Sequence, residues 1–346
     1  MADDDERSPG WQAIDAALKS LYPEEKPQHF GVLIPYDLGG PDPLRGLSAY
    51  RRADPEHWHF VSYGFTELFA KESPDKETSG FGFELTFRLA RPKDEDKPPA
   101  WALNFLQNLG RYVFQTGNAF GVGHHMSLNG PIAQGSPTEI RAIAFAADSE
   151  LGEFSSGNGR ARFLQVVGLT EDELALAMDW NAESLLKEMR GANPLLLTDL
   201  GRKSVLQDEA LAKRLHGLAG AEGSSMGEQE LDDGRFLPGP PFVWELGAMW
   251  VNSLLKGLRG RILHRRPFGF TAQKRSVEIA PADRSGFEMK GTTLSLKLTP
   301  GLASAMLFKI RPLRGDYQWP ELPGFLLRIV PTDIKGHKGE VINTIG

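Results

Sequence analysis

Two pairs of histidines are the residues of this chain whose types and spacing could do chemistry. His57 and His59 lie two positions apart, which would place both imidazoles on one face of a β-strand, and His124 and His125 follow later. Because zinc binds imidazole at tetrahedral sites with one open position, His57, His59 and His124 could form the centre of a metal-dependent hydrolase. Adjacent residues point to opposite faces of a strand, so only one histidine of the second pair could join such a centre.

The alternative interpretation of His57 and His59 is structural. They would then be partly buried, hydrogen-bonded residues that flank Trp58 in a strand. No metal-binding motif that contains a carboxylate accompanies them. The pattern therefore favours a strand of the scaffold, and we expect no bound metal.

Recognisable sites for cofactors are missing from the sequence. The stretch "SGFGFE", residues 79–84, lacks the third glycine and the following helix of a dinucleotide-binding loop, and no G-x-x-x-x-G-K-[ST] phosphate loop occurs. The chain has no cysteine, which excludes disulfides, thiolate-bound metals and a cysteine nucleophile. We expect no cofactor and no catalytic residues.

The net charge and the distribution of apolar residues indicate which partners and which location to expect. A net charge of -6 over 346 residues supplies no global positive field for nucleic acid. The arginines of "LRGRILHRRPF", residues 258–268, could contact phosphate or an acidic partner, but on a helix they would mostly form a solvated face. The N-terminus is acidic and unlike a signal peptide, and no apolar run approaches the roughly 20 residues of a membrane-spanning helix. We expect a cytoplasmic protein that binds neither nucleic acid nor membrane.

The first part of the chain is predicted to contain alternating strands and helices, which would position the histidines. Apolar residues recur at helical spacing over 11–21, and aromatic and β-branched runs predict strands over 29–36 and 57–65. The clearest strand covers 79–91, where five apolar residues share one face. Its other face carries Gly82, Glu84, Thr86 and Arg88. One face should be buried, and the other should be wet or covered by a partner.

The pattern of strands and helices continues after this strand. A helix begins at Trp101 and has Gly117 as its C-terminal cap, and a strand covers 161–169. Thr170 and Glu173 form a capping box for the next helix. A short helix and a further strand follow. Their residues are 182–190 and 194–200.

A change in composition divides the chain into two domains. Residues 10–216 form the larger N-terminal domain, and 217–241, rich in Gly, Ser, Pro and acidic residues, have no sustained periodicity and predict a flexible linker. Residues 242–331 form a smaller mixed domain, and 332–346 a loosely held tail. Because strands and helices alternate irregularly and several strands have one apolar face, we predict an α+β fold for both domains.

Five stretches resemble the Suppressor of fused family and occur in the order of that family. They are "LGGPDPLRGLSAYR", "PEHWHFVSYGFTELF", "SGFGFELTFRL", "GRYVFQTGNAF" and "FLQVVGLTEDEL". The second domain matches more thinly, through "LRGRILHRRPF" and "YQWPELPGFLLRIVP". The resemblance covers most of the first domain and extends in all over about 11–331.

The resemblance implies a non-enzymatic, two-domain protein that sequesters a protein partner. Animal members clamp a short extended peptide of Gli-type transcription factors between their domains, as an added β-strand. The tyrosine of the family motif "RYVFQ" lines that cleft and corresponds to Tyr112, and the nearby phenylalanine corresponds to Phe120. The expected partner-binding residues are therefore Tyr112, Phe120 and His124.

His124 marks a departure from the animal members. They place an acidic residue at this point, which pairs with a histidine of the Gli peptide, whereas this chain has an imidazole that supplies no such attraction. The long disordered insert of animal members is also missing. The chain thus resembles a bacterial-type member, for which the family suggests an immunity protein that neutralises a toxin domain. The alternatives are a regulator of an endogenous transcription factor and the histidine-ligated hydrolase described above.

Overall fold

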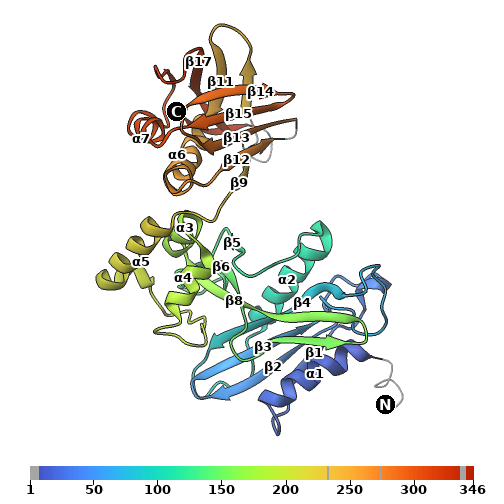
Figure 1. The fold of residues 1–346 in the computed structure, drawn as a ribbon. Coiled ribbons are helices and arrows are strands. Elements are labelled where there is room, and N and C mark those ends of the chain that lie inside the picture. The colour runs from blue at the N-terminus through green and yellow to red at the C-terminus, as the bar shows by residue number, and fades with distance from the viewer. Residues whose placement is uncertain (1–7, 232–233, 273, 336–339) are drawn as a thin grey trace. The chain divides into compact units, whose positions relative to one another are not determined.

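The computed structural model describes residues 8–231, 234–272, 274–335 and 340–346 (Figure 1). The chain forms two compact units, and strands and helices occur in both, as expected for an α+β fold. Unit 1 comprises Met1–Ala177 and Ala182–Lys213, and unit 2 comprises Met178–Asn181 and Arg214–Gly346. Within the described residues, no helix has the length and apolarity needed to cross a membrane.

Unit 1 is built on one eight-stranded sheet. The strands lie in the order β1-β2-β3-β4-β8-β6-β5, and β7 also pairs with β8. The β4–β8 pair is parallel, and the other pairs are antiparallel. Their bounds are β1 (Gln28–Gly31), β2 (Gly46–Ala53), β3 (Glu56–Tyr63), β4 (Thr78–Ala90), β5 (His125–Ser127), β6 (Ile140–Ala147), β7 (Glu153–Ser156) and β8 (Gly159–Thr170).

Two helices pack against different sets of buried side chains on this sheet. Helix α1 (Pro9–Leu21) inserts Ile14 and Leu18 into a cluster with Val61 of β3. Helix α2 (Ala100–Thr116) inserts its apolar stripe among the phenylalanines of β3 and β4. Because Val61 and its neighbour Phe60 belong to different clusters, and neighbouring residues point to opposite faces, the two helices cover opposite faces of the sheet (Figure 1).

The polar face of β4 differs from the prediction. Glu84, Thr86 and Arg88 are fully buried, so this face is neither wet nor left open for a partner. The chain covers it with its own side chains, and Glu84, Thr86 and Arg88 each have at least one polar partner within unit 1. Glu84 accepts hydrogen bonds from Ser62, Thr66 and two backbone amides. A sheet buried on both faces must satisfy its polar residues internally, because water cannot reach them.

Local signals at the helix ends are largely confirmed. Helix α2 ends at Gly117, whose φ of 74° is the left-handed conformation that glycine adopts most easily. Half of the predicted capping box forms, because Glu173 accepts the amide of Thr170 at 2.9 Å, while the Thr170 hydroxyl donates to Asp172 instead. Helix α3 (Glu171–Asp179) therefore begins where predicted. The remaining helices up to the end of α5 are α4 (Ala182–Met189), α5 (Glu209–Glu222) and the 3-10 turns η2 (Tyr36–Leu38) and η3 (Val205–Gln207).

The described part of unit 2 contains two small sheets, the helices α6 and α7 and the second half of α5. One sheet has the order β10-β11-β17-β16 and the other β14-β15-β13-β12-β9, and a separate hairpin joins β18 to β19. The strands are β9 (Glu228–Glu230), β10 (Gly234–Leu237), β11 (Phe242–Gly247), β12 (Phe268–Ala272), β13 (Arg275–Pro281), β14 (Gly286–Lys290), β15 (Thr293–Leu298), β16 (Gly315–Tyr317), β17 (Phe325–Val330), β18 (Thr332–Lys335) and β19 (Val341–Ile345). The helices are α6 (Val251–Gly260), α7 (Pro300–Lys309) and the 3-10 turns η4 (Ala248–Trp250) and η5 (Ile262–His264).

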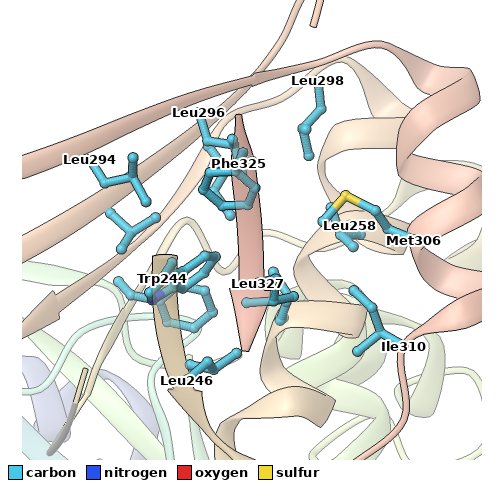
Figure 2. Close-up of a cluster of buried hydrophobic side chains, with 14 of the residues drawn as sticks. Trp244, Leu246, Leu258, Leu294, Leu296, Leu298, Met306, Ile310, Phe325 and Leu327 are labelled. Carbon is cyan, nitrogen blue, oxygen red and sulfur yellow. The ribbon is translucent and has the colours of Figure 1, made fainter. Parts of the chain in front are cut away.

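The core of unit 2 lies between its sheets and helices (Figure 2). Trp244 of β11 and Leu327 of β17 are fully buried there, together with Leu296 of β15. Leu258 of α6 and Met306 of α7 cover them from the helical side. Strands and helices thus both contribute to this core, as expected for a mixed domain.

Three stretches differ from their predicted structure. Residues 194–200 form no strand apart from one isolated bridge between Thr198 and Leu89, and the first predicted strand is limited to β1. The segment 217–241 is not an unstructured linker, because it holds the end of α5, β9 and β10, although residues 232–233 lie outside the described ones. The tail forms β18 and β19, with 336–339 outside the described residues. Backbone pairing forms β9, β10, β18 and β19, in stretches where side-chain periodicity did not indicate a strand.

Candidate partner-binding site

Three aromatic rings form a stack that runs from the surface into the core of unit 1. Tyr112 of α2 is 36% exposed, and its ring lies 5.5 Å from the ring of Phe120, tilted by only 11°. The Phe120 ring lies 4.2 Å from that of Phe145 in β6, which is buried. We call these three residues the aromatic stack. Because Phe145 supports Phe120 from the core, the exposed tyrosine ring rests on a fixed base.

His124 joins the aromatic stack through its backbone. Its carbonyl accepts a hydrogen bond from the amide of Phe145 at 2.9 Å, and its own amide donates to the carbonyl of Gly121 at 3.1 Å. Its exposed imidazole folds back over Gly121, since a Cβ built on that glycine would lie 3.4 Å from Nε2. The three residues predicted from the sequence are thus brought together around Phe145. Their role in binding, and the predicted cleft between the domains, stay predictions.

An open sheet edge begins at the residue after His124. Strand β5 is the last strand in the sheet order and pairs with β6 on its inner side. The carbonyl of His124 and the amide of Leu128 bond to β6. Because the peptide groups of successive strand residues point to opposite sides, those of His125 and Ser127 point toward the open edge. Such an edge can accept an added strand.

His57 and His59 of β3 lie in a buried polar network with Arg88 of β4 and with Asp148, the residue after β6. His59 contacts the hydroxyl of Tyr22 through Nδ1 at 2.6 Å, and its Nε2 lies 3.6 Å from Asp148. Arg88 donates to both carboxylate oxygens of Asp148, at 3.0 and 3.2 Å. His57 Nδ1 is 2.6 Å from the carbonyl of Pro55. We call Arg88, Asp148, His57 and His59 the buried network.

The pKa values of three side chains in the buried network are shifted from their usual values. Burial and, to a smaller extent, the positive charge of Arg88 lower the pKa of His59 from 6.5 to about 4. Burial likewise lowers the pKa of His57 to about 3. Burial alone would raise the pKa of Asp148, but the nearby imidazole of His59, the positive charge of Arg88 and the backbone amide of Leu151 hold that pKa well below its usual range. At neutral pH, this places two neutral imidazoles beside one arginine–carboxylate pair.

The predicted histidine set does not assemble into one centre. His57 and His59 share a face of β3 as expected, whereas His124 precedes β5, four strands away in the sheet order. The guanidinium of Arg88 lies 3.4 Å from Nε2 of His57, where it would repel a metal cation. Among the described residues, no group of three or more His, Cys, Asp or Glu side chains is arranged to hold a metal ion. The scaffold interpretation of His57 and His59 therefore fits their contacts.

A match to one catalytic motif lies in the connection between α5 and β9. Residues Gly223–Gly227, "GSSMG", have the spacing G-x-S-x-G of a nucleophile elbow, which places its serine on a turn from a strand into a helix. Here the order is reversed, because α5 precedes the segment and β9 follows it. Ser224 caps this turn by accepting the amide of Met226 at 3.1 Å. The segment is a helix-to-strand connection and lacks the elbow's context.

Comparisons with known proteins point to one family. A family model described as Suppressor of fused protein (SUFU) matches residues 40–203. The human Suppressor of fused homolog is 37% identical over 209 residues, which cover 56% of this chain and 43% of that protein. The chain thus matches less than half the length of this curated relative.

Two solved structures are similar to the chain. The crystal structure of Drosophila Suppressor of Fused has a TM-score of 0.82 at 24% identity, over 94% of this chain and 97% of that one. A chain in the Sufu–Fu complex crystal structure has a TM-score of 0.56 at 32% identity, over 60% of this chain and 98% of that one. The first match shows a shared fold over nearly the whole length of both chains.

Proposed function

Because this chain belongs to the Suppressor of fused family, we propose that it is a non-enzymatic module that binds and sequesters a protein partner. The observation that carries the proposal is the exposed ring of Tyr112, supported by the aromatic stack and close to the open edge of β5. The similar chain in the Sufu–Fu complex supports binding of a protein rather than a small molecule.

Strand addition on β5 is the proposed mode of binding. A partner segment in extended conformation would pair with the outward peptide groups of His125 and Ser127, and these main-chain hydrogen bonds would supply affinity without a sequence requirement. One partner side chain would pack on the ring of Tyr112, which supplies selectivity. Aromatic residues on a rigid base are typical energetic centres of such interfaces, because little side-chain entropy is lost on binding.

His124 is the residue that we expect to select the partner. An exposed imidazole beside the aromatic stack can donate a hydrogen bond to a carboxylate or carbonyl of the partner, whereas it lacks the negative charge with which a carboxylate attracts a cationic group. We therefore propose a partner other than the Gli-type peptide. A bacterial toxin domain, bound by this chain as its immunity protein, is the partner that we propose.

The identity of the partner can be tested by a pull-down with this protein from native lysate, in which mass spectrometry identifies the proteins that bind to it. Recovery of a toxin domain supports the immunity role. Recovery of a DNA-binding protein in its place overturns that role and favours a regulator of transcription.

The binding surface is tested with the variant Tyr112→Ala and the purified partner in calorimetric titrations. Loss of an aromatic energetic centre costs at least about 2 kcal/mol, so we expect binding to weaken by about 30-fold. Phe308→Ala is the matched control, since Phe308 of α7 is an aromatic residue 83% exposed in unit 2. If folded Tyr112→Ala, checked by circular dichroism, binds with the affinity of the Phe308→Ala control, the aromatic stack is not the binding surface.

A further inference from the structure

Unit 1 has a second surface feature with no part in the proposed function. A pocket of about 240 Å³ opens between the segment before β2 and the loop that joins β3 to β4. Five aromatic side chains contribute to its walls, namely Tyr36, Phe65, Phe69, Phe81 and Phe114. Most of its lining comes from four of the stretches that carry the family resemblance, although none of these residues belongs to the aromatic stack.

The pocket and the aromatic stack lie on different sides of α2. Phe114 contacts Tyr36 and Phe81, with ring centroids 5.6 and 5.1 Å away. Tyr112, two residues earlier, contacts Phe120 instead. Because residues two apart on a helix do not share a face, a ligand in the pocket would leave the stack free.

The backbone around the pocket is held in place before any ligand binds. Glu67 accepts the amides of Glu72, Ser73 and Gly80 and the ammonium group of Lys71, which closes the β3–β4 loop into a compact turn. Gly80 has a φ of 53°, and a Cβ there would lie 2.4 Å from the carbonyl oxygen of Phe65. A preformed wall of this kind lowers the entropic cost of binding.

The rim of the pocket carries more negative than positive charge. Its charged residues are Asp37, Glu67 and Glu72 against Arg45. Lys71 neutralises Glu67, and Arg45 pairs with Asp37 at 2.8 Å while lying over the ring of Phe69. Glu72 is exposed and makes no side-chain hydrogen bond or ion pair among the described residues. One carboxylate is thus available to a positively charged partner.

The segment that forms one wall also exposes apolar side chains. Leu33 is fully exposed and Leu38 is 73% exposed, and both flank the wall residue Tyr36. A group of exposed large apolar residues beside a pocket is typical of a protein interaction surface.

The volume of the pocket indicates whether its ligand is a small molecule or a single side chain. Pockets for small molecules hold about 300–1,000 Å³, and this one is smaller. We propose that the pocket binds one apolar or aromatic side chain of a partner segment, and that lysine or arginine residues beside this anchor pair with Glu72. The site is a second docking surface for a basic peptide, independent of strand addition on β5.

Synthetic peptides can test the proposal on the full chain. The probe is a fluorescein-labelled Gly-Arg-Arg-Phe-Arg-Arg-Gly peptide, followed by fluorescence anisotropy. Two comparison peptides replace the phenylalanine by alanine or all four arginines by glutamate. We expect the first peptide to bind at least tenfold more tightly than either comparison peptide. Absence of binding up to about 1 mM, or equal binding of the three peptides, overturns the proposal.

Matched variants then assign the binding to this pocket. Phe69→Ala removes an aromatic wall that is 49% exposed, and Glu72→Lys reverses the available charge, so each should weaken binding about tenfold. Glu24→Lys makes the same change of net charge at an exposed position outside the pocket, and should bind like the wild type. Tyr112→Ala should also bind the peptide normally, which separates this proposal from the proposed function. If Glu24→Lys weakens binding as much as Glu72→Lys does, the peptide responds only to net charge and the proposal fails.

Discussion

Replacement of Arg88 by leucine should be among the most damaging single changes in unit 1. Its side chain is fully buried on β4 and donates to Asp148, while Glu150 lies 2.6 Å away as a second ionic partner. Removal of one partner from a buried ion pair costs about 3–5 kcal/mol, because the other charge is left without compensation. The structure places the cost at the lower end, about 3 kcal/mol, for two reasons. Asp148 keeps the hydroxyl of Thr86 and two backbone amides as donors, and Glu150 reaches water.

Urea unfolding combined with hydrogen exchange measures this loss in unit 1. Peptides from β4 report the local free energy of opening, and those from β15 in unit 2 serve as an internal reference. Arg162→Leu is the matched control, since Arg162 of β8 pairs with Glu153 at 3.0 Å with its side chain 51% exposed. An exposed pair contributes about 0–1 kcal/mol, so the control should lose little stability.

A double variant tests the physical reason for the loss. Arg88→Leu combined with Asp148→Leu removes both charges, so it should be less destabilised than the sum of the two single variants. The reasoning is refuted if Arg88→Leu loses no more stability than Arg162→Leu. It is also refuted if the two single losses simply add.

Three further predictions follow from the structure. Because the pKa of His59 falls from 6.5 in the unfolded chain to about 4 in the folded one, stability should be constant above pH 6.5 and decrease by up to about 3 kcal/mol as the pH falls to 4. Urea unfolding at a series of pH values checks this, and a flat profile between pH 7 and 4.5 would contradict it. Leu327→Ala should cost about 2–5 kcal/mol and speed hydrogen exchange in unit 2 alone, since Leu327 is fully buried there. Gly80→Ala should cost at least about 1–2 kcal/mol because of its positive φ and the clash with Phe65, whereas Gly130→Ala, which meets nothing within 4 Å, should change the melting temperature little.

Periodicity in the sequence predicted the elements that build the fold. The strand over 79–91 and the helix from Trp101 to Gly117 are present as β4 and α2, because their apolar residues follow the period of each structure. The strand predicted over 194–200 is absent apart from one bridge, and β9 and β10 lie in the segment 217–241, where no strand was predicted. The pairing of β9 with β12 joins segments that are distant in sequence, and side-chain patterns do not report such pairing.

The candidate site was predicted in part. The family resemblance identified Tyr112 and Phe120, and their rings are stacked. Phe145 was missed as the base of the stack, because a phenylalanine in a buried strand carries no signal that distinguishes a support from any other core residue. The aromatic pocket was missed as well, since its walls come from segments that are distant in sequence.

The polar residues of β4 separate what the sequence determined from what the tertiary structure decided. The alternation of Glu84, Thr86 and Arg88 with apolar residues determined by itself that a strand forms and which side chains share a face. Whether that face meets water depends on what packs against it, and only the fold brings Asp148 and His59 onto it. Burial is the physical reason, because an arginine in water needs no partner, whereas an unpaired arginine inside a protein would destabilise the fold.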